Sequence, residues 1–237
     1  MIKKLALIAF VFFTLVNASQ AQSPTESAIY SQLVRPGKAS VLALDAVLKN
    51  PDFSSAAVLF IASTVAFRQK QVEDAAFLMY LGEIRVQFDH ALFPPKENVD
   101  ADPISTYTAL QQQLGSRVNP AIMEEPRLFA KVLAKVKNWS PKIAEGYGPG
   151  WEYAKIGNPK EAEAALATAK AEFLKTMGGL CTLLQDRAYF AAFKTVRNFS
   201  LKSGKGGPSQ QAYESAIQTM KRIERDKGIY GFATHGI

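Results

Sequence analysis

The stretch from Ala56 to Phe67 constrains the fold more than any other part of the sequence. Its residues are apolar or small all the way round a helix, so a helix formed here has no polar face to turn toward water. Such a helix belongs in the centre of a bundle, where other helices cover it. Helical signals dominate the rest of the chain, and no segment is a convincing strand. We therefore predict an all-α fold, an irregular bundle of about seven or eight helices.

Three further segments give helix boundaries that a structure can check. A helix is expected over about 73–92, with one apolar stripe facing the core. A shorter helix is expected over 104–114. Asn158-Pro159-Lys160-Glu161 places Asn at the N-cap and Pro at the first helical position, which is a strong helix start. We expect the helix that it opens to be interrupted at Gly178-Gly179.

The first residues have the features of an export signal. Lys3 and Lys4 give a positive start, and an apolar run of about 12 residues follows from Leu5 to Val16. As a helix that run rises only about 18 Å, which is too short for a hydrocarbon core of about 30 Å. We therefore expect a cleavable signal and no transmembrane segment after its removal.

Ser19-Gln20-Ala21 fits the small-x-small rule for signal cleavage, with a cut after Ala18 as the second choice. The prediction is a signal peptide over 1–21 and a single helical domain over 22–237, located in the periplasm or secreted. The chain has one cysteine, Cys181, so it has no internal disulfide and must be held together by packing. Cys181 stands in an apolar stretch, and we expect it to be buried as a small hydrophobe.

Residues 59–88 resemble a single helical hairpin of the tetratricopeptide or Sel1 type. The resemblance consists of an apolar helix, a short turn at Lys70-Gln71-Val72, and then Glu73-Asp74-Ala75-Ala76 with Tyr80-Leu81-Gly82. The glycine usual in the turn is missing, and no second copy stands beside it. The resemblance implies a scaffold that binds proteins, although arrays of this type need about three repeats to be stable.

Charge is distributed unevenly along the mature chain. Residues 22–126 contain 8 Lys/Arg and 12 Asp/Glu, a net charge of −4, whereas residues 127–237 contain 18 and 9, a net charge of +9. Outside the cytoplasm a basic half favours an acidic protein or an anionic envelope component, and it makes nucleic acid an unexpected partner.

Two basic helix faces are candidate binding surfaces, although ordinary solvated faces give the same pattern. The first has basic residues at i, i+4 and i+8, and the second lies on one side of a later helix. The residues are Arg127, Lys131 and Lys135 on the first face and Arg187, Lys194 and Arg197 on the second.

Most catalytic and metal-binding patterns are absent from the sequence. There are two histidines, no Gly-x-Ser-x-Gly and no His-Glu-x-x-His. Asn98 to Asp102 alternates oxygen ligands as a calcium loop does, but Pro103 stands where that loop needs glycine and Ala109 where it needs a bidentate Glu. Arg85 and Asp89 are spaced to pair on a surface helix. We predict no metal and no cofactor.

The irregular section from Trp139 to Asn158 carries the remaining candidate site. Tyr147, Trp151 and Tyr153 are candidate binding residues there, because aromatic rings flank a Gly-rich loop. Glu145 and Glu152 flank the same aromatics, as the paired carboxylates of a glycan-cleaving enzyme would. The same rings can equally pack over the end of the bundle.

The sequence favours an exported, non-enzymatic interaction protein, either an immunity or inhibitor protein or an adaptor. The alternative is an envelope-glycan enzyme that uses Glu145 and Glu152. A third hypothesis, a carrier of an apolar ligand, requires a cavity among residues 56–67.

Overall fold

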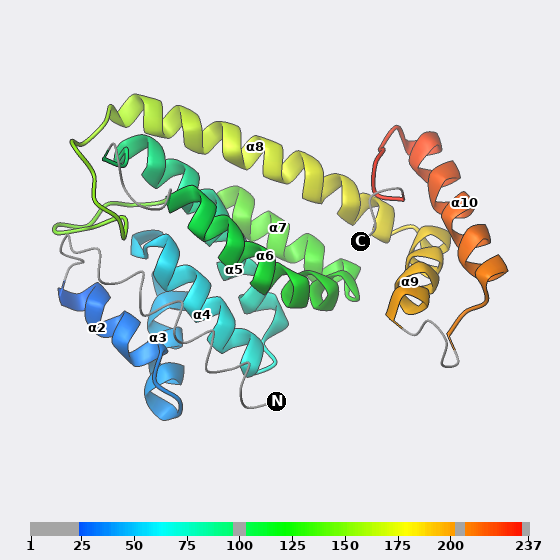
Figure 1. The fold of residues 1–237 in the computed structure, drawn as a ribbon, viewed down its shortest axis with the longest axis horizontal. Coiled ribbons are helices and arrows are strands. Elements are labelled where there is room, and N and C mark those ends of the chain that lie inside the picture. Colours follow the sequence, from blue (N-terminus) through cyan, green and yellow to red (C-terminus); the bar gives the residue numbers. More distant parts are fainter. Residues whose placement is uncertain (1–23, 97–102, 202–206, 234–237) are drawn as a thin grey trace.

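The structure, a computed structural model, describes residues 24–96, 103–201 and 207–233 (Figure 1). These residues form nine α-helices and one short 3-10 helix, with a single isolated β-bridge between Pro95 and Tyr153. The predicted all-α, multi-helix fold is therefore confirmed. The α-helices are α2 (Pro24–Leu33), α3 (Lys38–Lys49), α4 (Ala56–Arg68), α5 (Val72–Leu92), α6 (Pro103–Met123), α7 (Pro126–Asn138), α8 (Pro159–Leu184), α9 (Arg187–Leu201) and α10 (Gln210–Lys227).

Helices α4 and α5 form the centre of the bundle. α4 is buried along most of its length, as its apolar sequence requires, and α5 packs against α4, α6, α7 and α8. Gly82 on α5 lets the two central helices approach closely, because a Cβ there would lie 3.1 Å from the ring of Phe60. The hydroxyl of Ser63 also donates to the carbonyl of Ala75 at 2.6 Å. The resemblance to a tetratricopeptide hairpin thus falls on a closely packed helix pair.

Helix α6 is longer than predicted. It does not end near residue 114 but continues to Met123, with Pro120 inside it. Leu110, Leu114, Val118 and Ile122 are buried at intervals of four residues, so one apolar stripe continues to the end of the helix. Packing of this stripe outweighs the loss of one backbone hydrogen bond at the proline.

Helix α8 begins where the sequence predicts, and the Asn158 side chain accepts a hydrogen bond from the Lys160 amide at 3.0 Å. The predicted interruption at Gly178-Gly179 is wrong, because the helix continues to Leu184. The reason is a tertiary contact: a Cβ on Gly179 would lie 3.2 Å from the side chain of Ile229. Glycine at this position makes room for the chain that follows α10.

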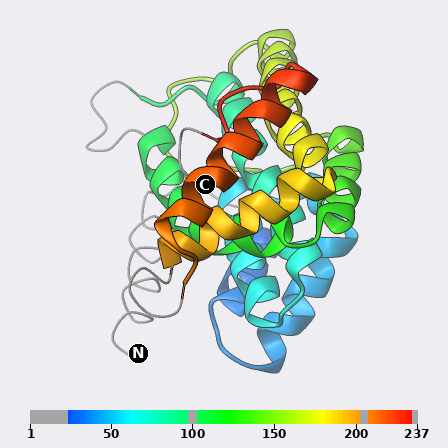
Figure 2. The ribbon, with the colours of Figure 1, turned by 90° about the vertical axis from the view of Figure 1, so that its right-hand side faces the viewer.

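Helices α9 and α10 pack together at the far end of α8, apart from α2 and α3 (Figure 1), and they face the viewer in Figure 2. The chain after α10 folds back onto this pair. Glu224, 4% exposed, accepts hydrogen bonds from the Tyr189 hydroxyl at 2.9 Å, the Gly231 amide at 3.1 Å and the Ala233 amide at 2.6 Å. Residues 228–233 are therefore held by a buried carboxylate.

Two segments discussed from the sequence lie outside the described residues. They are the predicted signal peptide over 1–21 and the segment Asn98–Asp102, whose oxygen ligands alternate as in a calcium loop. Within the described ranges, no helix is both long enough and apolar enough to cross a bilayer.

Candidate functional site

The irregular segment from Trp139 to Asn158 is fixed to the end of α5 and to the segment before α4 by hydrogen bonds spread along its length. The amide of Lys142 donates to the carbonyl of Asp52 at 2.7 Å, and the amide of Gly157 donates to the carbonyl of Leu92 at 2.6 Å. Between them, the indole of Trp151 donates to the carbonyl of Phe93 at 2.7 Å. These bonds give a loop without regular secondary structure a defined path.

Gly157 is required for this path. A Cβ at this position would lie 2.5 Å from the carbonyl oxygen of Ala91, a distance that no side chain tolerates. The loop can therefore approach the last turn of α5 only because residue 157 is glycine.

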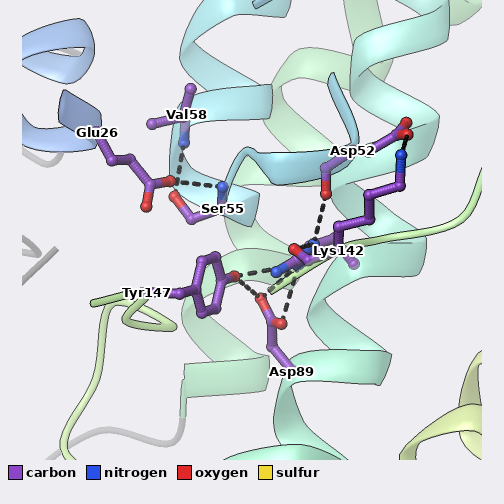
Figure 3. A network of polar contacts seen from close by, with 8 residues as sticks. Glu26, Asp52, Ser55, Val58, Asp89, Lys142 and Tyr147 are labelled. Carbon is purple, nitrogen blue, oxygen red and sulfur yellow. Dashed lines mark hydrogen bonds and ion pairs between the residues drawn. The ribbon is translucent and has the colours of Figure 1, made fainter. Parts of the chain in front are cut away.

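A buried ionic cluster lies beneath the loop (Figure 3). Arg85 and Asp89 pair at 2.9 Å with both side chains fully buried. The hydroxyl of Tyr147, a loop residue, donates to Asp89 and accepts from Nε of Arg85 at 3.1 Å. The expectation that Arg85 and Asp89 pair on a surface helix is correct about the pairing and wrong about the surface.

Arg85 also anchors the backbone on both sides of the cluster. Its Nη1 donates to the carbonyl of Asp52 at 3.1 Å and to that of Lys142 at 3.2 Å. Burial raises the pKa of Asp89, and the charge of Arg85 together with hydrogen bonds from Tyr147 and Arg85 offsets part of that rise. One guanidinium group thus joins α5 to the loop and to the segment before α4.

Glu26 on α2 is a second buried acid close to this cluster. It is 7% exposed and accepts a hydrogen bond from the amide of Ser55 at 2.6 Å. Burial raises the pKa of Glu26, and hydrogen bonds from Ser55 and the charge of Arg85 act in the opposite direction. Because Ser55 is the N-cap residue of α4, Glu26 connects α2 to the start of the central helix.

A pocket of about 840 Å³ lies between the loop, the C-terminal part of α5 and the first turns of α8. Its walls are mostly apolar, and Glu163 is the charged residue among those that form it. Ile143 and Ile156 lie on its loop side and are 43% and 64% exposed. We call this cavity the loop pocket.

The predicted aromatic residues of the loop lie in different environments. Tyr147 and Trp151 are buried, at 7% and 5% exposure, whereas Tyr153 is half-buried in the wall of the loop pocket. The rings of Tyr147 and Tyr153 pack on Phe93 with centroids 5.7 and 5.1 Å from it. The loop therefore packs its aromatics over the end of α5, the second of the two arrangements that the sequence allows.

The two carboxylates of the enzymatic hypothesis also differ in their environments. Glu152 is half-buried and forms an ion pair with Lys96 at 3.1 Å. Glu145 is exposed and has no ion-pair partner within the described part of the chain. The structure thus gives each of them a solvated setting near the loop.

The first basic face is partly neutralised within the molecule. Lys131 and Lys135 on α7 both pair with Glu73 on α5, at 2.9 and 2.5 Å, while Arg127 is exposed. Burial acts to raise the pKa of Glu73, but hydrogen bonds and charges from Lys135 and Lys131 outweigh it and lower the pKa.

On the second basic face, Arg197 and Lys194 also have partners within the molecule. Arg197 on α9 pairs with Glu124 at 2.5 Å and donates to the carbonyl of Pro120 at 3.2 Å. The ammonium group of Lys194 lies 4.7 Å from the ring centroid of Phe190, and Arg187 is exposed. Arg197 thus connects the C-terminal helix pair to the end of α6.

Glu83 is a residue whose environment the sequence does not reveal. It is half-buried on α5, and burial raises its pKa to about 7, while the neighbouring Gln111 on α6 acts to lower the pKa.

Cys181 is buried as predicted, and burial raises the pKa of its thiol. Across the described ranges, no three His, Cys, Asp or Glu side chains gather in a way that would hold a metal ion.

The apolar-carrier hypothesis needs a cavity along α4. The residues of α4 that face the core are 0–8% exposed, and none of the residues that form the loop pocket comes from α4.

Comparison with known proteins gives no relative. No family model matches the chain, and neither the curated proteins nor the solved structures contain a match.

Proposed function

We propose that the mature chain is an exported, non-enzymatic interaction protein whose loop pocket receives an apolar side chain of a partner protein. The observation that carries the proposal is the pocket itself, which is bordered by a loop held in place by buried hydrogen bonds. A binding surface that is already ordered loses less conformational entropy when the partner arrives.

The exposed apolar residues support the position of the site. Ile143 and Ile156 are large apolar side chains, both substantially exposed, and both border one cavity. Apolar surface gathered around a concave site is typical of protein interfaces, where an anchor side chain enters a pocket. An immunity or inhibitor protein and an adaptor would both use such a pocket.

The proposal of export rests on the sequence of residues 1–21, and the scaffold role is supported by the resemblance of residues 59–88 to a tetratricopeptide hairpin. The enzymatic alternative has less support. Glu145 and Glu152 have ordinary solvated surroundings, and Glu152 forms an ion pair with Lys96. A catalytic acid usually shows a perturbed environment in a cleft.

Affinity capture tests the proposal with residues 22–237 carrying a tag. The bait is exposed to its native envelope extract as the wild type, as Ile156→Lys, and as Leu42→Lys. Leu42 is the matched control, because it is an apolar residue of 57% exposure on α3 and does not border the loop pocket. The expected result is one protein at near-equal stoichiometry, retained by the wild type and by Leu42→Lys and lost with Ile156→Lys.

Two other results would count against the proposal. Equal retention by all three baits would place the binding surface elsewhere, and loss at high salt would then indicate the basic faces and an anionic partner. If no partner is captured but the wild type releases a product from purified cell wall that Glu145→Gln and Glu152→Gln abolish, the protein is a glycan-acting enzyme.

A further inference from the structure

A second cavity, of about 610 Å³, lies between α6 and α9, where the C-terminal helix pair meets the main bundle. It is separate from the loop pocket and shares no residue with it. Binding sites are common where two structural units meet. We call this cavity the α6–α9 cleft.

Two amide side chains of α6, Gln111 and Asn119, border the cleft, and a buried hydroxyl fixes the orientation of Asn119. The hydroxyl of Tyr80, a residue 1% exposed, donates to Oδ1 of Asn119 at 3.0 Å. The Nδ2 group of Asn119 makes no hydrogen bond within the described part of the chain, so its two hydrogens are available to a ligand. Gln111 also borders the cleft, and its side-chain amide carries a carbonyl oxygen that can accept from a ligand.

Gly115 lies between these two amides, and because it has no side chain it leaves space in the cleft. Gly115 lies four residues from each of them on the same face of α6, and Nδ2 of Asn119 would lie 3.2 Å from a Cβ at this position. Residues eight apart on a helix are separated by about 12 Å along its axis, which is the length of three to four residues of extended chain. The cleft therefore offers a donor and an acceptor at a spacing that suits a short extended peptide.

The remaining walls are apolar or electrically neutral. Met123 and Phe193 border the cleft as apolar residues that are 5% and 1% exposed, and Arg197 is already paired with Glu124. No uncompensated charge faces the cleft from the residues that form it. An uncharged ligand is therefore favoured over an ionic one, because neither a carboxylate nor an ammonium group would find a free opposite charge.

We infer that the α6–α9 cleft binds an extended, uncharged peptide segment through its main chain, with Asn119 donating to a peptide carbonyl and Gln111 accepting from a peptide N–H. A glycan is less well matched, because sugar rings stack on exposed aromatic faces and the aromatic ring of the cleft, Phe193, is 1% exposed. The inference rests on the proposed function only in taking the ligand from a partner protein.

The test adds a peptide or a glycan probe stepwise to ¹⁵N-labelled residues 22–237 and monitors binding by the change in NMR chemical shifts. The probes are acetyl-Ala-Ser-Ala-Ser-amide and chitotetraose, each raised to about 10 mM, a range in which even millimolar affinity is visible. The peptide is expected to shift the backbone amide of Gly115 and the side-chain amide of Asn119, while resonances of the loop pocket such as Tyr153 stay unchanged.

Asn119→Asp is the decisive variant, since it keeps the acceptor for Tyr80 and removes the two donors. It should weaken peptide binding by about tenfold or more, the cost of one good hydrogen bond and an unpaired acceptor. Gln113→Glu is the control, because it makes the same change of charge at an exposed position of α6 outside the cleft. If Asn119→Asp does not fold, Gly115→Ala, which places a methyl group against the Asn119 amide, should weaken binding in its place.

Three outcomes would overturn the inference. Binding of chitotetraose at Gly115 in preference to the peptide would assign the cleft to a glycan. Equal weakening by Gln113→Glu would show a long-range effect of charge. Absence of a shift with either probe would mean that the cleft is no binding site, without affecting the capture experiment on the loop pocket.

Discussion

Two regions of this molecule hold irregular chain against helices by the same kind of contact, a buried carboxylate bonded to a tyrosine hydroxyl. Under the loop of residues 139–158, Asp89 accepts from Tyr147. At the C-terminal end, Glu224 accepts from Tyr189 at 2.9 Å and from two backbone amides of residues 228–233. The loop borders a pocket, whereas the C-terminal segment covers Gly179 on α8.

The two regions differ in how the buried negative charge is compensated. Asp89 has a full positive charge beside it, since Arg85 pairs with it at 2.9 Å, whereas the Glu224 carboxylate accepts from one hydroxyl and two amides. Arg85 also reaches two backbone carbonyls, so one side chain orders three segments. The difference indicates that the loop is the more strongly fixed of the two, and that its removal would be the more costly.

The largest effect is expected from Arg85→Met. It leaves Asp89 fully buried and without its cation, and breaking a buried pair in this way costs about 3–5 kcal/mol of unfolding free energy. Urea denaturation measures the loss. The double variant Arg85→Met/Asp89→Leu should recover most of it, because an apolar pair has no charge to compensate; a double variant as unstable as the single one would contradict the account.

Glu83 provides the next largest effect, since it is a half-buried carboxyl whose pKa is raised by burial. Its pKa is about 7 in the folded protein against 4.5 as the ordinary value, so the folded state holds the proton more tightly and stability falls as pH rises from about 4.5 to 7. Glu83→Gln should therefore stabilise the protein by about 2–3 kcal/mol at pH 8 and have no such effect below pH 4.

The matched variant for this pH series is Glu73→Gln. The pKa of Glu73 is lowered by Lys135 and Lys131, so its carboxylate contributes stability at neutral pH that is lost as pH falls. The substitution should cost less than about 1 kcal/mol at pH 8, as expected for a surface pair. Stability curves of equal slope for the two variants between pH 4 and 8 would refute the assigned environments.

A smaller effect is expected from Glu224→Gln. The amide can still accept through one oxygen but presents an NH₂ group to a backbone N–H, which leaves a buried donor unpaired at a cost of about 1–2 kcal/mol. Hydrogen exchange at Gly231 and Ala233 should accelerate more than the overall loss of stability explains. The exposed control Glu214→Gln should stay within about 0.5 kcal/mol of the wild type.

The smallest and most specific effect concerns the two adjacent glycines of α8. A Cβ on Gly178 meets nothing within 4 Å, so Gly178→Ala should stabilise the helix by about 0.5–1 kcal/mol. Gly179→Ala should lose that gain, since its methyl group would lie 3.2 Å from Ile229. Equal gains from both substitutions, measured by thermal unfolding, would show that residues 228–233 do not pack on α8.

The all-α class and the central position of residues 56–67 could be predicted because apolar periodicity is a local property of the sequence. The burial of Arg85 and Asp89 could not, since an i, i+4 ion pair has the same spacing on a surface and in a core, and Tyr147 is 58 residues from Asp89. The same holds for Gly179, whose neighbour Ile229 comes from another helix end. In each case a contact distant in sequence determined the outcome.

The environment of the loop residues could be predicted only in part. The aromatic, Gly-rich composition of residues 139–158 drew attention to this segment, and the segment borders the loop pocket. The inward orientation of Tyr147 and Trp151 depends on partners supplied by α5 and by the residue that follows it. The sequence gives no sign of these partners, because backbone carbonyls such as that of Phe93 are present at every position.

Hydrogen exchange of the loop amides tests most directly the central claim that the buried cluster keeps the loop in a fixed shape beside the pocket. The amides of Lys142 and Gly157 donate to carbonyls outside the loop, so in the wild type they should exchange as slowly as amides of α5. In Asp89→Asn the Lys142 amide should exchange much faster, while Gly231 and Ala233 keep their wild-type rates. Rapid exchange of the Lys142 and Gly157 amides in the wild type would contradict the account.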